Sequence, residues 1–433
     1  MFIREINLTN VGPIQALKIA PRFSHAGDPV PLALVGQNGA GKSLALSLIL
    51  DALTEARRRS FRKIPEVSET DYLRLSSKNY VRHGANYSHA HVKISDGTHE
   101  LKYDELVSRV DIASFQTSAP PELLALPGIV GNNEFEAGGF YKYLTLPDVA
   151  HEAIRRSSIT YFPYFRYEKP YWLSTSANVD FIAQENLYGI ARYNPVRTNV
   201  IEETKRWILN LALDREIYEK KLIPIPVNPP LNPNLNLPNM FIGYSGPNDK
   251  VLSLINEVIL AMLKAGDPTF TAGRIGIGRK GNRVLSISGT RQGHPEEVIV
   301  PQIDQLSSGQ LMSLGLATEI IRAYELVHGS VPDQLNAVSG IALIDEVDLH
   351  LHINFQKTLL PTLLRKFPRV QFIMTTHSPF FLLGMAELGA IDIVNLPIGN
   401  RITPEEFSEF EVGYDVFVKK NEQFRSRYQL LTE

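Results

Sequence analysis

A glycine-rich turn near the start of the chain has the residue types that bind phosphate. It runs Gly36-Gln37-Asn38-Gly39-Ala40-Gly41-Lys42-Ser43 and fits the phosphate-loop pattern G-x-x-x-x-G-K-S without a mismatch. Its glycines let the backbone curl, so that N–H groups approach phosphate oxygens with no Cβ in the way. Lys42 supplies a cation for the β- and γ-phosphates, and Ser43 supplies a hydroxyl for Mg²⁺. The turn predicts a site for ATP and Mg²⁺, with contacts from Gly36, Asn38, Gly39, Ala40, Gly41, Lys42 and Ser43.

Two apolar segments flank this turn and would hold it in place. Residues Leu32–Val35 have the pattern of a buried strand, and Leu44–Leu53 have the apolar period of a helix. The helix begins at Lys42 and Ser43, so the positive end of its dipole faces the same anion. A chance glycine turn before a helix is the alternative, and the strand–turn–helix context argues against it.

A second apolar segment ends in two carboxylates, as a Walker B strand does. Residues Ser339–Glu346 read SGIALIDE, a buried strand followed by Asp345 and Glu346. Ligands of parallel α/β sheets bind at the edge where strands end. We expect Asp345 to hold Mg²⁺ and Glu346 to orient and deprotonate the attacking water. The alternative, charged residues that only solvate a strand end, is less consistent with the upstream phosphate loop.

Two further segments carry groups that could meet phosphate. Residues Leu306–Gln310, LSSGQ, open an apolar helix over Leu311–Tyr324, so a serine at the helix N-cap and free N–H groups again make an anion site. The residues concerned are Ser307, Ser308, Gly309 and Gln310. The apolar strand Gln371–Met374 ends in TTHSP, and His377 lies where a strand tip could reach a γ-phosphate.

In this order the four motifs resemble an ATP-binding-cassette (ABC) ATPase. LSSGQ is similar to that family's LSGGQ signature, with Ser308 in place of the first glycine. The resemblance implies a composite site, in which one chain's phosphate loop and Walker B strand close on the signature of another chain. It also implies that Glu346 and His377 are catalytic, His377 as the switch histidine. His350 and His352 match the D-loop, which makes them interface residues rather than metal ligands.

Within that superfamily the chain is similar to the soluble RecF/SMC/OLD branch. The opening EINLTNVGPI and the DEVDLHLH segment carry this resemblance, which covers roughly residues 1–60 and 300–385. It implies an α/β ABC-ATPase P-loop fold with an antiparallel β subdomain and a helical, proline-containing insertion. The expected division is an N-terminal ATPase lobe at 1–60, the insertion at 61–300 and a C-terminal ATPase lobe at 301–433. No glutamine is assigned to the family's Q-loop, for which Gln116 is only a weak candidate.

Parts that accompany this ATPase in other members are missing from the sequence. No heptad pattern for a long coiled coil occurs, and only a short segment with a helical pattern at Asp415–Leu431 follows His377, in place of a Toprim nuclease domain. The chain therefore resembles the stand-alone ATPase subunits of bacterial anti-phage systems such as Septu and PARIS. That resemblance implies two kinds of partner, further copies of the chain in at least a head-to-tail dimer and a separate nuclease effector.

Composition limits the compartment and leaves nucleic acid open. The chain has 433 residues, no cysteine and a net charge of −2. Lack of cysteine excludes disulfides and thiolate metal sites and predicts a cytoplasmic protein, and no apolar run is long enough for a membrane span. A balanced charge neither excludes nor favours nucleic acid. The basic cluster Arg57–Arg59 is either such a contact or a solvated helix end favoured by the dipole.

The remaining pattern predicts several elements around the motifs. Hairpins are expected from strands at residues 2–9 and 14–19, around Asp96-Gly97 and around residues 279–282, and a core strand at Ser158–Tyr167. Helices are expected at Asn199–Lys221 and Asn248–Lys264. The prolines between residues 223 and 238 exclude a helix or a central strand and predict an extended connector or exposed loop.

Three functions compete at this point. The first is an ATPase sensor or scaffold that oligomerises and controls a nuclease in phage defence, and the second is a RecF-like DNA-repair ATPase. The third, the ATPase subunit of a transporter, fits least, because its membrane-facing helical segment differs from this proline-rich middle. Strong, salt-sensitive DNA binding by the purified chain would favour repair over defence.

Overall fold

The computed structural model describes residues 1–61, 80–126, 140–145, 147, 150–164, 166, 194–224, 239–278 and 284–409. The chain forms two compact units, which we call unit 1 and unit 2. Unit 1 comprises Met1–Thr198, Ser339–Pro361 and Pro368–Glu433, and unit 2 comprises Asn199–Val338 and Thr362–Phe367. The expected lobes and insertion, with bounds at 60/61 and 300/301, stay a prediction about domain organisation.

A six-stranded, mainly parallel sheet in unit 1 brings the distant motifs together. Its order is β16 (Asn400–Arg401), β15 (Asp392–Asn395), β3 (Leu32–Val35), β14 (Arg369–Thr375), β13 (Ser339–Ile344) and β7 (Ile159–Phe162). All neighbours pair in parallel except β15 and β16. Because parallel strands end at the same edge, the residues after β3, β14, β13 and β7 lie along one line.

The second sheet of unit 1 is antiparallel and five-stranded. Its order is β2 (Ile14–Ile19), β1 (Phe2–Val11), β4 (Tyr87–Ser95), β5 (Glu100–Ser108) and β6 (Phe140–Thr145). The turn between β1 and β2 uses positive φ at Asn10 and Gly12, 56° and 51°, a conformation that Asn and Gly adopt most readily. The hairpins predicted at the N-terminus and around Asp96-Gly97 are thus confirmed.

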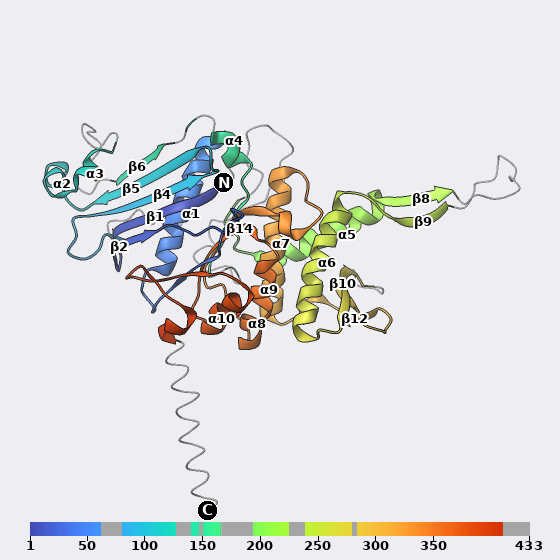
Figure 1. Ribbon diagram of the computed structural model, residues 1–433. Helices are drawn as coiled ribbons and strands as arrows, with labels where there is room; N and C mark the ends of the chain where they lie inside the picture. The colour runs from blue at the N-terminus through green and yellow to red at the C-terminus, as the bar shows by residue number, and fades with distance from the viewer. Residues whose placement is uncertain are drawn as a thin grey trace, which may run out of the picture. The chain divides into compact units, whose positions relative to one another are not determined.

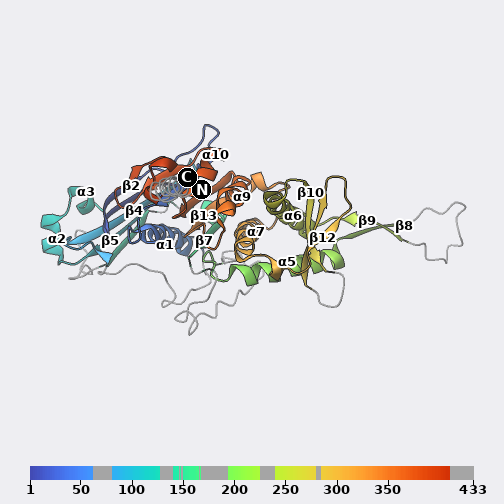
Figure 2. The same ribbon diagram turned by 90° about the horizontal axis from the view of Figure 1, so that it is seen from below.

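The core of unit 1 lies around helix α1 (Lys42–Ser60). Apolar side chains of α1, among them Leu46, Ile49 and Leu53, belong to one buried cluster with residues of both sheets. The helix lies along the five-stranded sheet (Figure 1), and the view from below shows it beside β7 and β13 as well (Figure 2). Buried Gln371 of β14 hydrogen-bonds both backbone groups of Ile3 in β1, at 2.7 and 2.8 Å, which ties the two sheets together.

Short helices complete unit 1. They are α2 (Ile112–Ser118), α3 (Pro121–Leu124), α4 (Ala150–Arg155), α8 (Ile353–Lys357) and α10 (Pro379–Leu388), while α9 (Leu359–Arg365) runs through the boundary between the units. Helix α4 packs on α1, and α10 packs on α8. The parallel sheet, the glycine turn before α1 and the antiparallel sheet confirm the predicted α/β P-loop fold with an antiparallel β subdomain.

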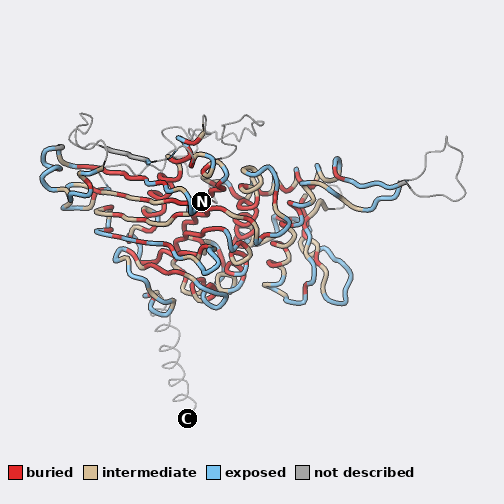
Figure 3. Tube along the Cα trace, turned by 45° about the horizontal axis from the view of Figure 1, so that its top comes forward, coloured by how far each residue is buried: buried red, intermediate tan, exposed pale blue. Residues whose placement is uncertain are grey.

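Unit 2 combines three long helices with a small antiparallel sheet. The helices are α5 (Val200–Tyr218), α6 (Pro247–Gly266) and α7 (Ser308–His328), and the sheet is β10 (Phe270–Ile277), β11 (Leu285–Arg291) and β12 (Glu297–Val300). A two-stranded ribbon, β8 (Lys220–Pro224) and β9 (Asn239–Tyr244), extends from α5. Its strands are largely exposed in Figure 3. The two predicted helices are confirmed, with ends that differ from the prediction by one to three residues.

Prolines limit two of the predicted segments. The core strand predicted over Ser158–Tyr167 covers only Ile159–Phe162, because Pro163 cannot continue the ladder, and it is an edge strand. Ile223 and Pro224 form the end of the ribbon strand β8, which respects the exclusion of a central strand. The rest of the proline segment, the turn at 279–282 and the helix predicted at Asp415–Leu431 lie outside the described residues.

Candidate nucleotide site

The glycine-rich turn has the shape that its composition predicts. It joins β3 to α1, and Gly36, Gly39 and Gly41 have φ of 138°, 81° and 94°. A Cβ at Gly36 would lie 2.4 Å from the carbonyl oxygen of Leu396, so the close approach alone requires glycine there. The backbone thus curls in front of the first turn of α1, where N–H groups and the helix dipole favour an anion.

Lys42 folds back over this turn. Its Nζ donates to the carbonyl oxygens of Gly36, at 2.7 Å, and Gln37, at 3.1 Å. Burial lowers the pKa of Lys42, and the carboxylates of Glu409, Asp345, Glu346 and Asp348 oppose that shift. Since a buried cation is stable only when its charge is compensated, the site is suited to a bound anion.

Asp345 is the point where three strand tips converge. Its Oδ1 accepts from the Ser43 hydroxyl at 3.0 Å and from the Thr375 hydroxyl at 2.6 Å, although Asp345 lies 302 residues after Ser43. Its Oδ2 is buried and has no hydrogen-bond partner among the residues that the structure describes. A buried carboxylate oxygen left without a donor fits a hard cation or its water, and the adjacent Ser43 hydroxyl is a ligand type that Mg²⁺ accepts. The predicted metal residues therefore fit the ion.

Glu346 has an unusual backbone conformation. Its φ is 49°, in the left-handed region that costs an L-residue about 1–2 kcal/mol. Its backbone N–H donates to Thr375 Oγ1 at 2.7 Å, the same hydroxyl that donates to Asp345. Such strain persists where surrounding contacts determine it, and it is common at functional sites. No role was assigned to Thr375 from the sequence, although it is the first residue of the TTHSP motif.

Arg166 is a second residue that sequence reasoning missed. It follows the tip of β7 and is fully buried, with 0% of its surface exposed. Its guanidinium donates to the carbonyl oxygens of Asp345 at 2.6 Å and Glu346 at 2.9 Å. Burial lowers its pKa to about 10, and the carboxylates of Asp345, Asp348 and Glu346 oppose the shift. The signal in the sequence is an arginine near the end of the aromatic segment Ser158–Tyr167.

His377 comes from the tip of β14 on the same edge. Its Nδ1 lies 3.5 Å from Oε1 of Glu409, and both side chains are partly exposed. The preceding Thr376 donates to Oδ1 of Asp348, which links the β14 tip to the segment after Walker B. The structure thus brings His377, Lys42, Ser43, Asp345 and Glu346 to one sheet edge; their roles stay predictions.

The predicted D-loop histidines have local surroundings that differ. His352 caps α8, because its Nδ1 accepts from the Asn354 N–H at 3.3 Å. His350 is exposed and has a φ of 64°. Both histidines lie at the surface, and His352 also caps a helix.

The signature segment lies in unit 2 at the start of α7. Ser307 is the N-cap and forms a capping box with Gln310, each side chain accepting from the other's backbone N–H. The helix starts at Ser308, three residues before the predicted Leu311. Ser308 is exposed and Gly309 is buried. The predicted N-cap is confirmed, and Ser308 is accessible to a ligand.

Comparisons with known proteins fit this geometry. Residues 199–383 match the family described as "AAA domain, putative AbiEii toxin, Type IV TA system". The matched range is less than half of the chain. The matched range includes the signature, Walker B and switch-histidine segments, and the phosphate loop precedes it.

Similar proteins include bacterial ATPases. The chain is 42% identical over 80 residues to "Retron Vc95 probable ATPase" of Vibrio cholerae serotype O1 biovar El Tor, covering 18% of this chain and 15% of that protein. It is 44% identical over 75 residues to "Retron Ec83 probable ATPase" of Escherichia coli, covering 17% and 14%. It is 30% identical over 145 residues to "Septu protein PtuA" of Bacillus mycoides (strain KBAB4), covering 30% and 20%. The aligned part is thus a fifth or less of each relative.

Solved structures with a similar course of the chain include SMC head domains. The "SmcHead bound to the C-winged helix domain of ScpA" aligns with 91% of this chain and 94% of its own chain, at 14% identity and a TM-score of 0.43. The "SMC head domain from Thermotoga maritima" aligns over the same shares at 16% identity and a TM-score of 0.40.

Two further features singled out in the sequence are the Q-loop candidate and the basic cluster at residues 57–59. Gln116, the Q-loop candidate, is exposed on α2. Arg57 is buried and lies 5.3 Å from the centre of the Phe61 ring, while Arg58 and Arg59 pair with Glu55. The basic cluster is thus largely engaged at the helix end, which favours the structural alternative over nucleic-acid contact. None of the described helices has the length and apolar character to cross a membrane.

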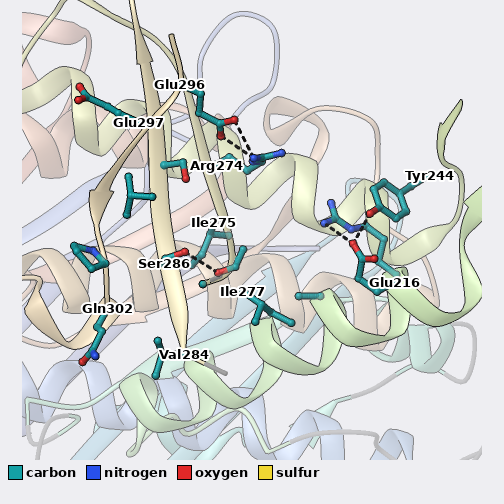
Figure 4. A pocket seen from close by; sticks show the side chains of 17 residues that line it. Glu216, Tyr244, Arg274, Ile275, Ile277, Val284, Ser286, Glu296, Glu297 and Gln302 are labelled. Atoms are coloured by element: carbon teal, nitrogen blue, oxygen red, sulfur yellow. Dashed lines mark hydrogen bonds and ion pairs between the residues drawn. The ribbon is translucent and has the colours of Figure 1, made fainter. Parts of the chain in front are cut away.

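Unit 2 contains a cavity of about 880 Å³ between α5, β9 and the β10–β12 sheet (Figure 4). Its charged side chains face one another. Arg274 pairs with Glu296 at 2.7 Å, the Tyr244 hydroxyl donates to Glu216, and the Arg215 guanidinium lies 4.3 Å from the centre of the Tyr244 ring. These groups compensate each other's charge within the wall.

Proposed function

We propose that the protein binds MgATP at the phosphate loop and hydrolyses it. The observation that carries this proposal is the convergence on Asp345, whose Oδ1 accepts from Ser43 and Thr375 while its buried Oδ2 has no partner. A carboxylate held so rigidly, with one oxygen left for an ion, has little structural use, because an unpaired buried polar atom destabilises a fold.

Each residue at the sheet edge has a distinct task in this proposal. Lys42 exchanges its two carbonyl partners for phosphate oxygens, and Ser43 and Asp345 hold Mg²⁺, which neutralises phosphate charge when bound. Glu346 takes the proton of the attacking water, and His377 contacts the γ-phosphate from the neighbouring strand tip. When His377 contacts the γ-phosphate, its pair with Glu409 either breaks or orients the imidazole toward the phosphate.

The signature segment completes the site from a second chain. One chain carries one phosphate loop and one signature, and Ser308 is exposed at the start of a long helix whose dipole favours an anion. ATP held by Lys42 of one chain and capped by Ser308 of the other then joins the chains in a two-fold, head-to-tail pair.

Complementation tests this shared site. Lys42→Ala and Ser308→Arg chains are each expected to be inactive, and a mixture is expected to regain part of the ATPase activity, because hetero-pairs contain one intact site. Normal hydrolysis by Ser308→Arg alone would contradict the shared site. A mixture without activity, although hetero-pairs form, would show that hydrolysis is not shared or that both sites must act together.

In the cell, we propose, the ATPase is a cytoplasmic sensor or scaffold that controls a separate nuclease in anti-phage defence. Support comes from the similarity to retron ATPases and to the Septu protein PtuA, which covers only a part of each. Expressing the chain with its genomic neighbours should yield a co-purifying nuclease, and the pure chain should cleave neither plasmid nor tRNA. Strong, salt-sensitive DNA binding by the chain alone would instead favour a RecF-like repair function.

A further inference from the structure

One buried guanidinium holds the turn that carries the proposed catalytic base. Arg166 donates from Nη1 to the carbonyl oxygens of Pro163, at 3.1 Å, and Asp345, at 2.6 Å, and from Nη2 to that of Glu346, at 2.9 Å. The first acceptor lies at the tip of β7 and the other two lie at the tip of β13. Arg166 thus links two neighbouring strand tips, and its acceptor Asp345 lies 179 residues after it in the sequence.

The peptide groups around Glu346 are fixed from two sides. Thr375 accepts from the Glu346 N–H at 2.7 Å, and Arg166 donates to the Glu346 carbonyl. The left-handed φ of 49° turns the carbonyls of Asp345 and Glu346 toward the same guanidinium. The planar fork of donors in an arginine guanidinium can serve two adjacent carbonyls at once, whereas a lysine ammonium is a compact point charge. The contact therefore selects one backbone conformation at Glu346.

We infer that Arg166 is a positioning residue for hydrolysis, which directs the Glu346 carboxylate by holding its backbone in the left-handed conformation. This inference rests on the proposed function, because it takes Glu346 as the base. Arg166 is fully buried behind the turn and acts through Glu346. Arg166 contacts Asp345 at its backbone carbonyl, whereas the side chains of Lys42, Ser43 and Asp345, which hold nucleotide and Mg²⁺ in the proposal, have contacts of their own with Gly36, Gln37 and Thr375 and with one another.

The experiment separates binding from turnover in Arg166→Met and Arg166→Lys. The affinity for ATP, measured in the presence of Mg²⁺ by calorimetry, is expected to stay within about threefold of the unchanged protein. The kcat is expected to fall about 100-fold in Arg166→Met, since a displacement of a catalytic group by about 1 Å has an effect of this size. Arg166→Lys, which keeps the charge and has its three N–H donors on one nitrogen, is expected to recover part of the kcat.

Arg197→Met is the matched control. Arg197 is also buried, with 3% of its surface exposed, and its Nη1 donates to the Asn194 carbonyl. Its backbone N–H donates to the Tyr161 carbonyl of β7, so Arg197 lies beside the same strand. The Arg197→Met substitution makes the same change in size and charge near β7 as Arg166→Met. The kcat of the Arg197→Met variant is expected to stay within about twofold of the unchanged protein. An equal loss of kcat in both variants would assign the effect to β7 packing and overturn the inference.

A double-mutant cycle with Glu346→Gln decides whether Arg166 acts through Glu346. In that background Arg166→Met is expected to cause no further loss of turnover, because the base it positions is already gone. Independent, multiplying losses would overturn the inference, as would normal kcat in a folded Arg166→Met chain or a parallel loss of ATP binding. If Arg166→Met does not fold, the same cycle is read from Arg166→Lys. Unchanged turnover in Glu346→Gln alone would instead refute Glu346 as the base, and with it this inference.

Discussion

The edge of the six-stranded sheet and the cavity of unit 2 both gather acidic and basic side chains, but they compensate the charges differently. At the sheet edge, Lys42 is bonded to neutral carbonyls and Oδ2 of Asp345 has no partner. In the cavity, Arg274 has Glu296, and Glu216 has both Tyr244 and Lys220. The first region contains charges that a bound ligand could compensate, and the second contains charges that are already paired.

This difference separates a binding site from a structural surface. A buried charge without a partner destabilises the folded chain, so its retention indicates a ligand that compensates it. Exposed ion pairs contribute little to stability and little to recognition, because water competes with both partners. The volume of the cavity is therefore a weaker indicator of function than the state of one carboxylate oxygen at Asp345.

The largest effect is expected for Lys42→Ala. The change removes the cation at a site meant for several phosphate charges, so ATP binding should become undetectable while the circular dichroism spectrum and the thermal transition stay close to those of the unchanged chain. Titration with a fluorescent ATP analogue measures this. Tight ATP binding by the variant would remove the distinction between the two regions.

Glu346→Gln is expected to bind ATP normally and to lose about 100- to 1,000-fold in kcat, because glutamine keeps the shape of the side chain and loses the base. Single-turnover hydrolysis and gel filtration with ATP measure the slow step and the trapped assembly. Near-normal turnover would mean that the base lies elsewhere, with His377 the next candidate.

A smaller loss is expected for Thr375→Val, which keeps the volume and removes the hydroxyl shared by Asp345 and Glu346. Changes to residues that orient ligand-binding side chains reduce activity by about 10- to 100-fold. Thr375→Ser, which retains the hydroxyl, is the control and should keep most of the kcat. Equal activity of the valine and serine variants would show that the hydroxyl does not matter.

The smallest effect is expected in unit 2. Arg274→Gln breaks the pair with Glu296, in which the side chains are 58% and 44% exposed. The free energy of unfolding in urea should change by less than about 1 kcal/mol, and kcat should not change. A large loss of ATP hydrolysis here would give the cavity a functional role that its paired charges do not predict.

Much of the local structure followed from residue types and spacing. The glycines at 36, 39 and 41 require positive φ within a short turn, and the serine at 307 is a preferred N-cap, so both features can be read without knowledge of distant contacts. Alternating apolar residues gave the hairpin at the N-terminus for the same reason. Prolines limited β7 and the ribbon strand β8, though their effect on the length of β7 was underestimated.

The sequence by itself determined which residue types could bind phosphate and Mg²⁺, because each motif is a local arrangement of neighbours along the chain. Only the tertiary structure decided that β7 lies beside β13, that Arg166 reaches the carbonyls of residues 179 and 180 positions away, and that one hydroxyl of Thr375 serves both Asp345 and Glu346. These contacts depend on the order of strands in a parallel sheet. That order arises from burial of the whole core, to which no single segment of the sequence corresponds.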